Sequence, residues 1–173
     1  MQLRHGVQLP AVRPISHCVV ELARAADAPS IAAMSRRLIE MGLEPSWPAE
    51  RVLRHILHPE SVVLTAKLDG ELSGFAIMQF GDDSAHLNLF AVEGGNRRRG
   101  IGRRLLSWLE QTAMTAGTFL IRLELRATND EARRFYAAAG YRETARVRGY
   151  YQRLEDAIRM ERDLRVHRDA TEN

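Results

Sequence analysis

The chain has 173 residues, of which 45% are hydrophobic and 27% charged, and it carries a formal net charge of +3 at pH 7. These values are ordinary for one soluble globular domain that can bury a proper core. No apolar run approaches the length of a membrane span, the N-terminal region lacks the apolar stretch of a signal peptide, and the single cysteine, Cys18, excludes an internal disulfide. A cytoplasmic protein is therefore expected, and the positive charge points to polyanionic partners.

The first half of the chain predicts an extended arm, one strand, two helices and a hairpin. The arm lacks periodicity and contains two prolines. Each helix combines an apolar face with a proline in its first turn, and the hairpin contains Asp69-Gly70, which suits a tight turn with positive φ. The predicted segments are the arm 1–16, the strand 18–24, helices over 27–42 and 46–59, and the hairpin strands 62–67 and 72–80.

The second half predicts two strands, each followed by a helix, and a final hairpin; the second of these strands is expected over 119–126. A strand ends at Val92, a long helix ends at Gly117, and a capping box, Thr128 to Glu131, opens the last helix. The domain is expected over 17–164, followed by a polar tail, 165–173. The element order β-α-α-β-β-β-α-β-α-β-β predicts an α+β fold in which one sheet is layered with helices.

A basic turn that contains glycine joins the strand ending at Val92 to the long helix. Residues 97–104 contain five arginines, and the glycines at 100 and 102 let the backbone approach a ligand closely. The free N–H groups at the start of the helix favour an anion, so the turn predicts a pyrophosphate site. A nucleoside-triphosphate loop would need Lys and Ser or Thr after Gly100, and a dinucleotide loop would need glycine in place of Leu105. The remaining alternative is a solvated, basic helix start.

The pattern Arg-x-x-Gly-x-Gly at residues 97–102 resembles the acyl-CoA pyrophosphate loop of the GCN5-related N-acetyltransferases (GNAT superfamily), and the element order over 18–164 is also theirs. Further segments, 123–129, 132–141 and 148–160, resemble ribosomal-protein-alanine N-acetyltransferases and their relatives that modify protein N-termini. The resemblance implies a GNAT-type mixed, mostly antiparallel, splayed sheet of about seven strands flanked by four helices. It also implies acetyl-CoA as co-substrate.

The same resemblance implies where acetyl-CoA binds. The end of the strand before the basic turn would pair with the pantetheine amides, and a backbone N–H near Val92 would stabilise the negative charge that develops on the acetyl carbonyl. The alternative for the implied asparagine, Asn129, is a plain helix cap. The implied cofactor-binding residues are Phe90, Ala91, Val92, Arg97, Arg98, Arg99, Gly100, Ile101, Gly102 and Asn129.

Two residues are candidates for proton transfer. An α-amino group has a pKa of about 8, so a base must remove its proton before acetylation, and Glu124 on the polar face of a strand is the candidate. Tyr136 is the candidate acid that protonates the leaving thiolate. The alternatives are a solvated Glu124 paired with Arg122 or Arg126, and a Tyr136 that only fills the core. Cys18 is expected to be a small core residue, so direct transfer through a ternary complex is predicted.

The acceptor is expected to be the N-terminal α-amine of a protein, held between the loop 43–47 and the hairpin 148–156. Trp47, Tyr150 and Tyr151 are the candidate substrate-binding residues, with small first residues such as Ala or Ser preferred. The alternatives are a small-molecule amine such as a polyamine or aminoglycoside, and a non-catalytic acyl-CoA or RNA binding module. The six histidines form no metal pattern and are expected at the surface, so no metal is predicted. A monomer or homodimer without a membrane partner is expected.

Overall fold

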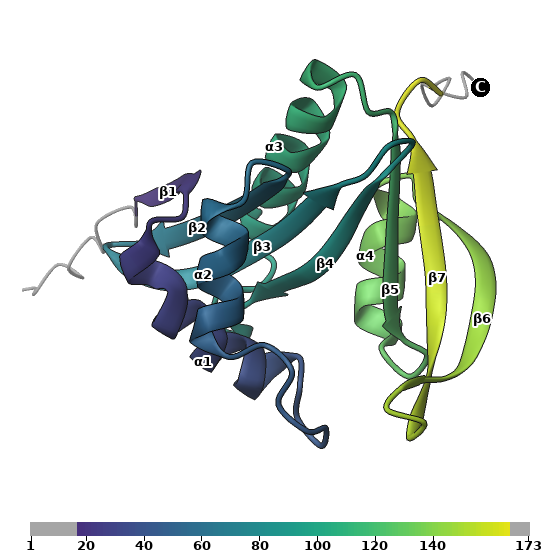
Figure 1. Ribbon diagram of the computed structural model, residues 1–173, viewed down its shortest axis with the longest axis horizontal. Coiled ribbons are helices and arrows are strands. Elements are labelled where there is room, and N and C mark those ends of the chain that lie inside the picture. Colours follow the sequence, from purple (N-terminus) through teal and green to yellow (C-terminus); the bar gives the residue numbers. More distant parts are fainter. Residues whose placement is uncertain (1–16, 167–173) are drawn as a thin grey trace, which may run out of the picture.

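The computed structural model describes residues 17–166, and the predicted order of strands and helices is confirmed (Figure 1). The predicted arm 1–16 and all of the predicted tail beyond residue 166 lie outside the described residues. The elements within 17–166 are β1 (Cys18–Leu22), α1 (Ala28–Leu38), α2 (Ala49–Leu57), β2 (Ser61–Leu68), β3 (Glu71–Phe80), β4 (Ala85–Val92), α3 (Ile101–Thr115), β5 (Leu120–Arg126), α4 (Asp130–Ala138), β6 (Arg142–Tyr151) and β7 (Glu155–Asp163).

The described strands form one sheet in the order β1-β2-β3-β4-β5-β7-β6. All neighbouring strands are antiparallel except β4 and β5, which are parallel because α3 carries the chain back across the sheet. This parallel pair is short: it aligns Ala85, His86 and Leu87 with residues 121–123 of β5, and beyond these residues the strands diverge. The mixed, mostly antiparallel and splayed sheet is thus confirmed, and the divergence of β4 from β5 can be followed in Figure 1.

A β-bulge lies in β4 at the point where the two strands diverge. Leu87 and Leu89 pair with the consecutive residues Met78 and Ile77 of β3, so Asn88 is an extra residue without a partner in the register. Leu87 packs into the core beneath α3 and α4, whereas Leu89 packs into the core beneath α1 and α2. Without the bulge, residues two positions apart would face the same side of the sheet.

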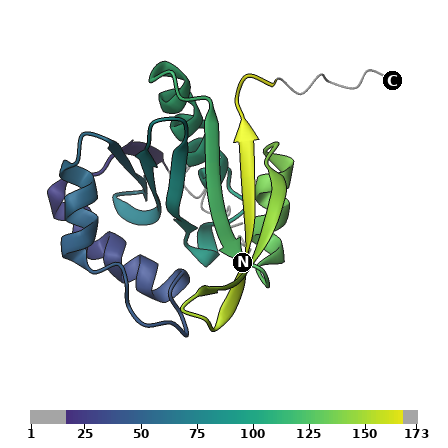
Figure 2. The same ribbon diagram turned by 45° about the vertical axis from the view of Figure 1, so that its right-hand side comes forward.

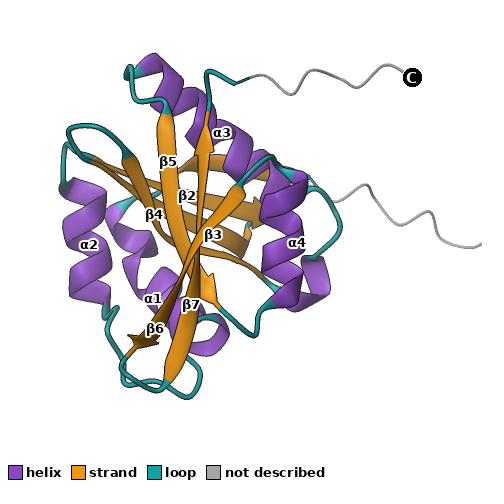
Figure 3. Ribbon diagram, turned by 90° about the vertical axis from the view of Figure 1, so that its right-hand side faces the viewer, coloured by secondary structure: helices purple, strands orange, loops and turns teal. Residues whose placement is uncertain are grey.

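The two faces of the sheet carry separate hydrophobic cores. Figure 3 shows a pair of helices on each side of the sheet. Helices α1 and α2 cover one face, where Ile31, Val52 and Phe75 are fully buried. Helices α3 and α4 cover the other face, where Leu105 and Leu109 are fully buried. The site described below lies where β4 and β5 diverge between these two layers.

Two helix boundaries differ from the prediction. Helix α1 ends at Leu38, before the predicted end at Gly42, and beyond it the side chain of Glu40 accepts hydrogen bonds from the backbone N–H groups of Ser46 and Trp47. The predicted capping box at Thr128 is wrong, since Asn129 caps α4 and its Oδ1 accepts a hydrogen bond from the N–H of Ala132 at 3.0 Å.

Candidate active site

Two cavities meet at the point where β4 and β5 diverge. The first, here called the basic cavity, has a volume of about 580 Å³ and lies between the end of β4 and helices α3 and α4. The second, here called the inner cavity, has a volume of about 430 Å³ and is covered by the α1–α2 loop and the β6–β7 turn. Both cavities are lined by Ile39, Phe90, Ala132 and Tyr136, so they adjoin at these side chains.

The turn before α3 forms one wall of the basic cavity. Gly100 has φ +79°, a left-handed conformation that favours glycine, and it directs the chain into α3. The first N–H groups of α3 have no partner within the helix and are available to an anion, as the sequence predicts. Gly102 allows close packing, because an added Cβ would lie 3.4 Å from the ring of Phe135 and 3.7 Å from that of Phe90.

Most of the predicted cofactor-binding residues line the basic cavity. Arg97 is oriented by an ion pair from its Nη1 to Glu131 Oε2 at 2.8 Å and by a hydrogen bond from its Nε to the carbonyl of Val92 at 3.3 Å. Two predicted side chains do not line it: Arg99 donates to Asn96, and Ile101 is buried in the core. The predicted residues that line it are Phe90, Ala91, Val92, Arg97, Arg98, Gly100, Gly102 and Asn129.

Asn129 is a helix cap, and its predicted contact with the cofactor stays a prediction. Its Oδ1 caps α4, which is the plain structural role, while the residue also lines the basic cavity. The cap fixes the side chain in one orientation and leaves the amide Nδ2 available as a donor.

Tyr136 occupies the boundary between the two cavities. Its ring packs against those of Phe90, Phe135 and Tyr141, at centroid distances of 5.1–6.0 Å. The residue is buried, and this burial raises the pKa of the Tyr136 hydroxyl above its usual value of 10.0. The hydroxyl therefore stays protonated and can donate a hydrogen bond at neutral pH. Tyr136 is a core aromatic and at the same time lines both cavities.

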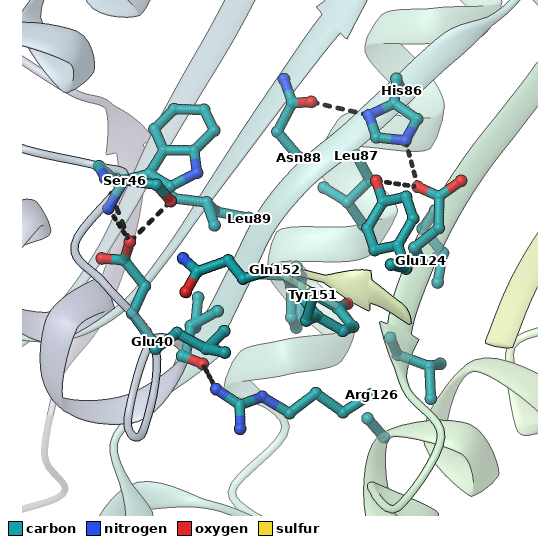
Figure 4. A pocket seen from close by; sticks show the side chains of 18 of the residues that line it. Glu40, Ser46, His86, Leu87, Asn88, Leu89, Glu124, Arg126, Tyr151 and Gln152 are labelled. Atoms are coloured by element: carbon teal, nitrogen blue, oxygen red, sulfur yellow. Dashed lines mark hydrogen bonds and ion pairs between the residues drawn. The ribbon is translucent and has the colours of Figure 1, made fainter. Parts of the chain in front are cut away.

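Glu124 lies at the inner cavity and is held there by side chains from three other strands. Figure 4 shows its contact with His86. His86 Nε2 lies 2.6 Å from Glu124 Oε2, Arg159 Nε donates to Oε1 at 2.8 Å, and the Tyr150 hydroxyl donates to Oε2 at 3.3 Å. The Glu124 side chain is only 7% exposed. The proposed solvated role, in which Arg122 or Arg126 pairs with Glu124, is wrong: these arginines pair with Glu161 and Glu155 instead.

The surroundings of Glu124 change the pKa of two groups. Burial raises the pKa of the Glu124 carboxyl, but the hydrogen bonds from His86 and Arg159 outweigh it and lower this pKa to about 2. The hydrogen bond with Glu124 raises the pKa of His86 above 6.5, against the effects of burial and of Arg159. The His86 Nδ1 atom also lies 2.7 Å from Asn88 Oδ1, so the bulge residue orients the imidazole ring (Figure 4).

Two of these partners escaped the sequence analysis. His86 was expected at the surface with the other histidines, yet its Nε2 contacts the candidate base. The signal was its position in β4, on the strand that leads to the basic turn. Arg159 lies directly opposite Glu124 in the register of β5 and β7. Finding it required the knowledge that β7, the last of the described strands, is inserted between β5 and β6.

The rim of the inner cavity joins two segments that are far apart in sequence and lie side by side in Figure 2. The Gln152 side chain accepts a hydrogen bond from the N–H of Glu44 and donates one to its carbonyl, both at 2.9 Å. Arg126 donates to the carbonyls of Ile39 and Met41 at 2.7 Å and 2.8 Å. The loop 43–47 and the hairpin 148–156 are thus bridged rather than separated by an open groove.

The three predicted substrate-binding residues all line the inner cavity. Tyr150 and Tyr151 approach it from the end of β6, with their rings 5.0 Å apart. Trp47 differs from the exposed aromatic that its loop position suggested, because it is only 9% exposed and the guanidinium of Arg51 lies 3.9 Å from its ring centroid. Its place in the wall is fixed by packing, not by solvent contact.

Searches for other kinds of site gave two results within residues 17–166. No cluster of three or more His, Cys, Asp or Glu side chains in this range could hold a metal ion. In the same range, every helix is too short or too polar to cross a membrane.

Comparisons with known proteins agree with this architecture. The model of the acetyltransferase (GNAT) family matches residues 31–141. The [ribosomal protein bS18]-alanine N-acetyltransferase of Salmonella typhimurium is 40% identical over 95 residues, which are 53% of this chain and 64% of that protein, so the match spans less than two thirds of the relative's length.

Two solved structures are similar over most of the chain. The ribosomal-protein-S18-alanine N-acetyltransferase from Escherichia coli has a TM-score of 0.75 at 25% identity and covers 91% of this chain and 100% of its own. Ard1 from Thermoplasma volcanium has a TM-score of 0.75 at 27% identity, covering 85% and 97%. With its splayed sheet, its basic turn and a family match over more than half of its length, the chain belongs to the acetyltransferase (GNAT) family.

Proposed function

We propose that this protein is an acetyl-CoA-dependent N-acetyltransferase that moves the acetyl group directly to the N-terminal α-amine of a protein. The observation that carries the proposal is the meeting of the two cavities at Phe90 and Tyr136. A basic cavity suits a phosphate-bearing acyl donor, and an inner cavity with a buried carboxylate suits an amine acceptor. Family membership supports the reaction class, and the two N-acetyltransferases named above support the acceptor class.

The residues of the basic cavity fit acetyl-CoA. Arg97 and Arg98 offer charge-assisted hydrogen bonds to the pyrophosphate next to the free N–H groups of α3. The end of β4 lies beyond its short pairing with β5, so its backbone can pair with the pantetheine amides on that side. A backbone N–H near Val92 would stabilise the oxyanion, as the sequence analysis expects.

The chemistry is divided between the two cavities. Glu124 accepts the proton of the acceptor amine, directly or through one water molecule, on the inner side. Tyr136 remains protonated through burial and donates to the leaving thiolate at the boundary. Direct transfer requires both substrates at once, which the shared wall of the two cavities permits.

A peptide end fits the inner cavity better than a polycation does. A polyamine or aminoglycoside would need free carboxylates, but Glu40 is buried and bonded to Ser46 and Trp47, and Glu124 is bonded to His86 and Arg159. Arg51 and Arg126 add positive charge to the wall. This charge distribution favours a single amine attached to an otherwise neutral or acidic chain.

The test is an acetylation screen of peptides that begin with Ala, Ser, Met or Glu, with lysine peptides, polyamines and aminoglycosides as competitors. Free thiol release measures turnover, and calorimetry measures acetyl-CoA binding. We expect binding of acetyl-CoA and turnover of peptides with a small first residue.

Other outcomes would contradict parts of the proposal. Efficient turnover of a small amine with no peptide acetylated would show that the acceptor is a small amine and not a protein N-terminus. Binding without thiol release for any amine would indicate a non-catalytic acyl-CoA protein, and absence of binding at millimolar acetyl-CoA would contradict the proposal. RNA binding that persists at saturating coenzyme A would indicate an RNA module.

A further inference from the structure

The geometry around Glu124 points to a role for His86 that family membership does not assign. We propose that His86 is the positioning residue that orients Glu124 and holds the proton that Glu124 removes from the acceptor amine, before releasing it to water. This inference rests on the proposed function, because it concerns the fate of a proton in that reaction.

His86 lies beside the candidate base at the inner cavity and is the more exposed of the two side chains. Its Nε2 lies 2.6 Å from Glu124 Oε2, a distance short enough for proton transfer between the two atoms. The His86 side chain is 41% exposed, whereas that of Glu124 is 7% exposed. A proton that reaches Glu124 from the inner cavity therefore has a path through the imidazole to water.

Glu124 is poorly suited to keep the proton itself. Burial raises its pKa, but the hydrogen bonds from His86 and Arg159 stabilise the ionised form and lower this pKa to about 2. An α-amine has a pKa of about 8, so this carboxyl binds a proton much more weakly than the amine does. The carboxylate can pass a proton onward, but another group must hold it.

The groups that face His86 increase the affinity of its imidazole for a proton. Glu124 on β5 and the neutral Asn88 on β4 raise its pKa above 6.5, and Arg159 on β7 opposes them. Arg122, the register neighbour of His86 on β5, is ion-paired with Glu161, and the Tyr150 hydroxyl from β6 shares the Glu124 oxygen. The register neighbour on β3 is the uncharged Gln79.

The proton can be followed atom by atom. When His86 is protonated, its Nδ1 donates to Asn88 Oδ1 at 2.7 Å and its Nε2 donates to Glu124 Oε2 at 2.6 Å. Once this imidazolium has given one proton to water, the Nδ1 hydrogen stays bonded to Asn88 and Nε2 can accept a proton. An N–H bond of the acceptor ammonium breaks, its electron pair stays on nitrogen, and the proton passes to a Glu124 oxygen, directly or through water. It then moves from Oε2 to Nε2, which leaves a carboxylate and an imidazolium. The imidazolium finally gives a proton to water, while Arg159 keeps its charge throughout.

The test is the pH dependence of kcat at saturating acetyl-CoA and peptide for wild type, His86→Gln, Glu124→Gln and His58→Gln. Gln at position 86 can still donate a hydrogen bond to Glu124 but cannot hold a proton. His58 is an exposed histidine after α2 and outside both cavities, so His58→Gln is the matched control.

For wild type and His58→Gln, kcat should fall as the pH drops through the pKa of His86, above 6.5. His86→Gln should lose this acidic limb and show kcat lower by about 10-fold to 10²-fold at pH 8, with the acceptor KM and the acetyl-CoA affinity nearly unchanged. Retention of both the limb and the wild-type kcat in His86→Gln would overturn the inference and leave the proposed function intact. A wild-type protein that acetylates no amine would overturn the proposed function and the inference together.

Two further measurements decide the case if His86→Gln is inactive or unfolded. Added imidazole should restore turnover at least about tenfold in His86→Ala, and no restoration in a variant that still binds acetyl-CoA would contradict proton holding. NMR titration of the wild type should give His86 a pKa above 6.5, which falls in Glu124→Gln; a wild-type pKa below 6.5 would also contradict it.

Discussion

The basic cavity and the inner cavity are built in different ways. The basic cavity is formed mainly by two short stretches of chain, 90–103 and 129–136, and it offers backbone N–H groups and exposed arginines. The inner cavity depends on side chains from distant elements: His86 and Glu124 are separated by 38 positions, and Glu44 and Gln152 by 108. Recognition of the acyl donor is therefore local in sequence, whereas recognition of the acceptor is a property of the assembled sheet.

The largest effects should follow changes at the boundary and at the inner cavity. Glu124→Gln and Tyr136→Phe should each lower kcat by roughly 10²–10⁴-fold, because each removes one proton-transfer group. Acetyl-CoA affinity should change little, since the arginines of the basic cavity remain. Thiol release and calorimetry measure the two quantities. Activity within a few-fold of wild type for both variants would show that the assigned roles are wrong.

The buried carboxylate of Glu124 should also affect how the free energy of unfolding changes at acidic pH. The pKa of Glu124 is about 2 in the folded protein and 4.5 ordinarily, so its stabilising contribution is complete above pH 4.5 and is lost as the pH falls toward 2. Between pH 5 and 3, wild type should lose on the order of 1–3 kcal/mol more unfolding free energy than Glu124→Gln. Urea titrations at pH 6, 5, 4 and 3 measure the difference.

Arg97→Ala is the control for that comparison, because the ion pair of Arg97 with Glu131 is exposed and should add little to stability. It should follow the wild-type pH dependence. If Glu124→Gln shows the same pH dependence as wild type, the ionised Glu124 with its partners His86 and Arg159 does not stabilise the fold as described.

Substitution of an arginine in the basic turn should weaken acetyl-CoA binding more strongly if that arginine lines the basic cavity. Arg97→Ala should weaken acetyl-CoA binding by about 10-fold to 10²-fold through loss of charge-assisted hydrogen bonds, with kcat at saturation nearly unchanged. Arg99 does not line the cavity, so Arg99→Ala should change the affinity by less than about threefold, an electrostatic effect alone. Equal losses in both variants would mean that general positive charge, not the wall of the cavity, binds the phosphates.

The smallest effect should follow loss of the hydrogen-bonded bridge across the rim of the inner cavity. Gln152→Ala removes two hydrogen bonds to Glu44 and should raise the acceptor KM by about threefold to tenfold. The affinity for acetyl-CoA should stay the same, because the bridge is remote from the basic cavity. Arg153→Ala, at the next position of the same turn, serves as the control. A change in acetyl-CoA affinity instead would show that binding in the two cavities is not independent.

The sequence predicted best what depends on neighbouring residues. The basic turn, the strand before it and the helix after it follow from glycine conformations and apolar periodicity, both of which are local properties. Glu124 and Tyr136 were selected by resemblance and chemistry, and the structure brings both to the inner cavity. Their roles stay predictions.

The partners of Glu124 could not be predicted in the same way. Strand alternation favoured Arg122 and Arg126, which share its face, but the insertion of β7 beside β5 brings Arg159 opposite it. The burial of Trp47 likewise depends on Glu40, which satisfies the backbone of the loop from inside the fold. Such contacts are set by strand order and packing, and no local pattern encodes them.

The bulge in β4 has a consequence for how this strand can vary. Asn88 shifts the alternation of the strand, so that His86 faces the inner cavity beside Glu124 while Phe90, with the same even spacing, packs with Phe135 and Tyr136 of α4. Deleting this one residue would exchange inward and outward positions in one half of β4. A change of one residue in the length of this strand would therefore be more disruptive than a conservative substitution, and insertions or deletions in related chains should avoid it.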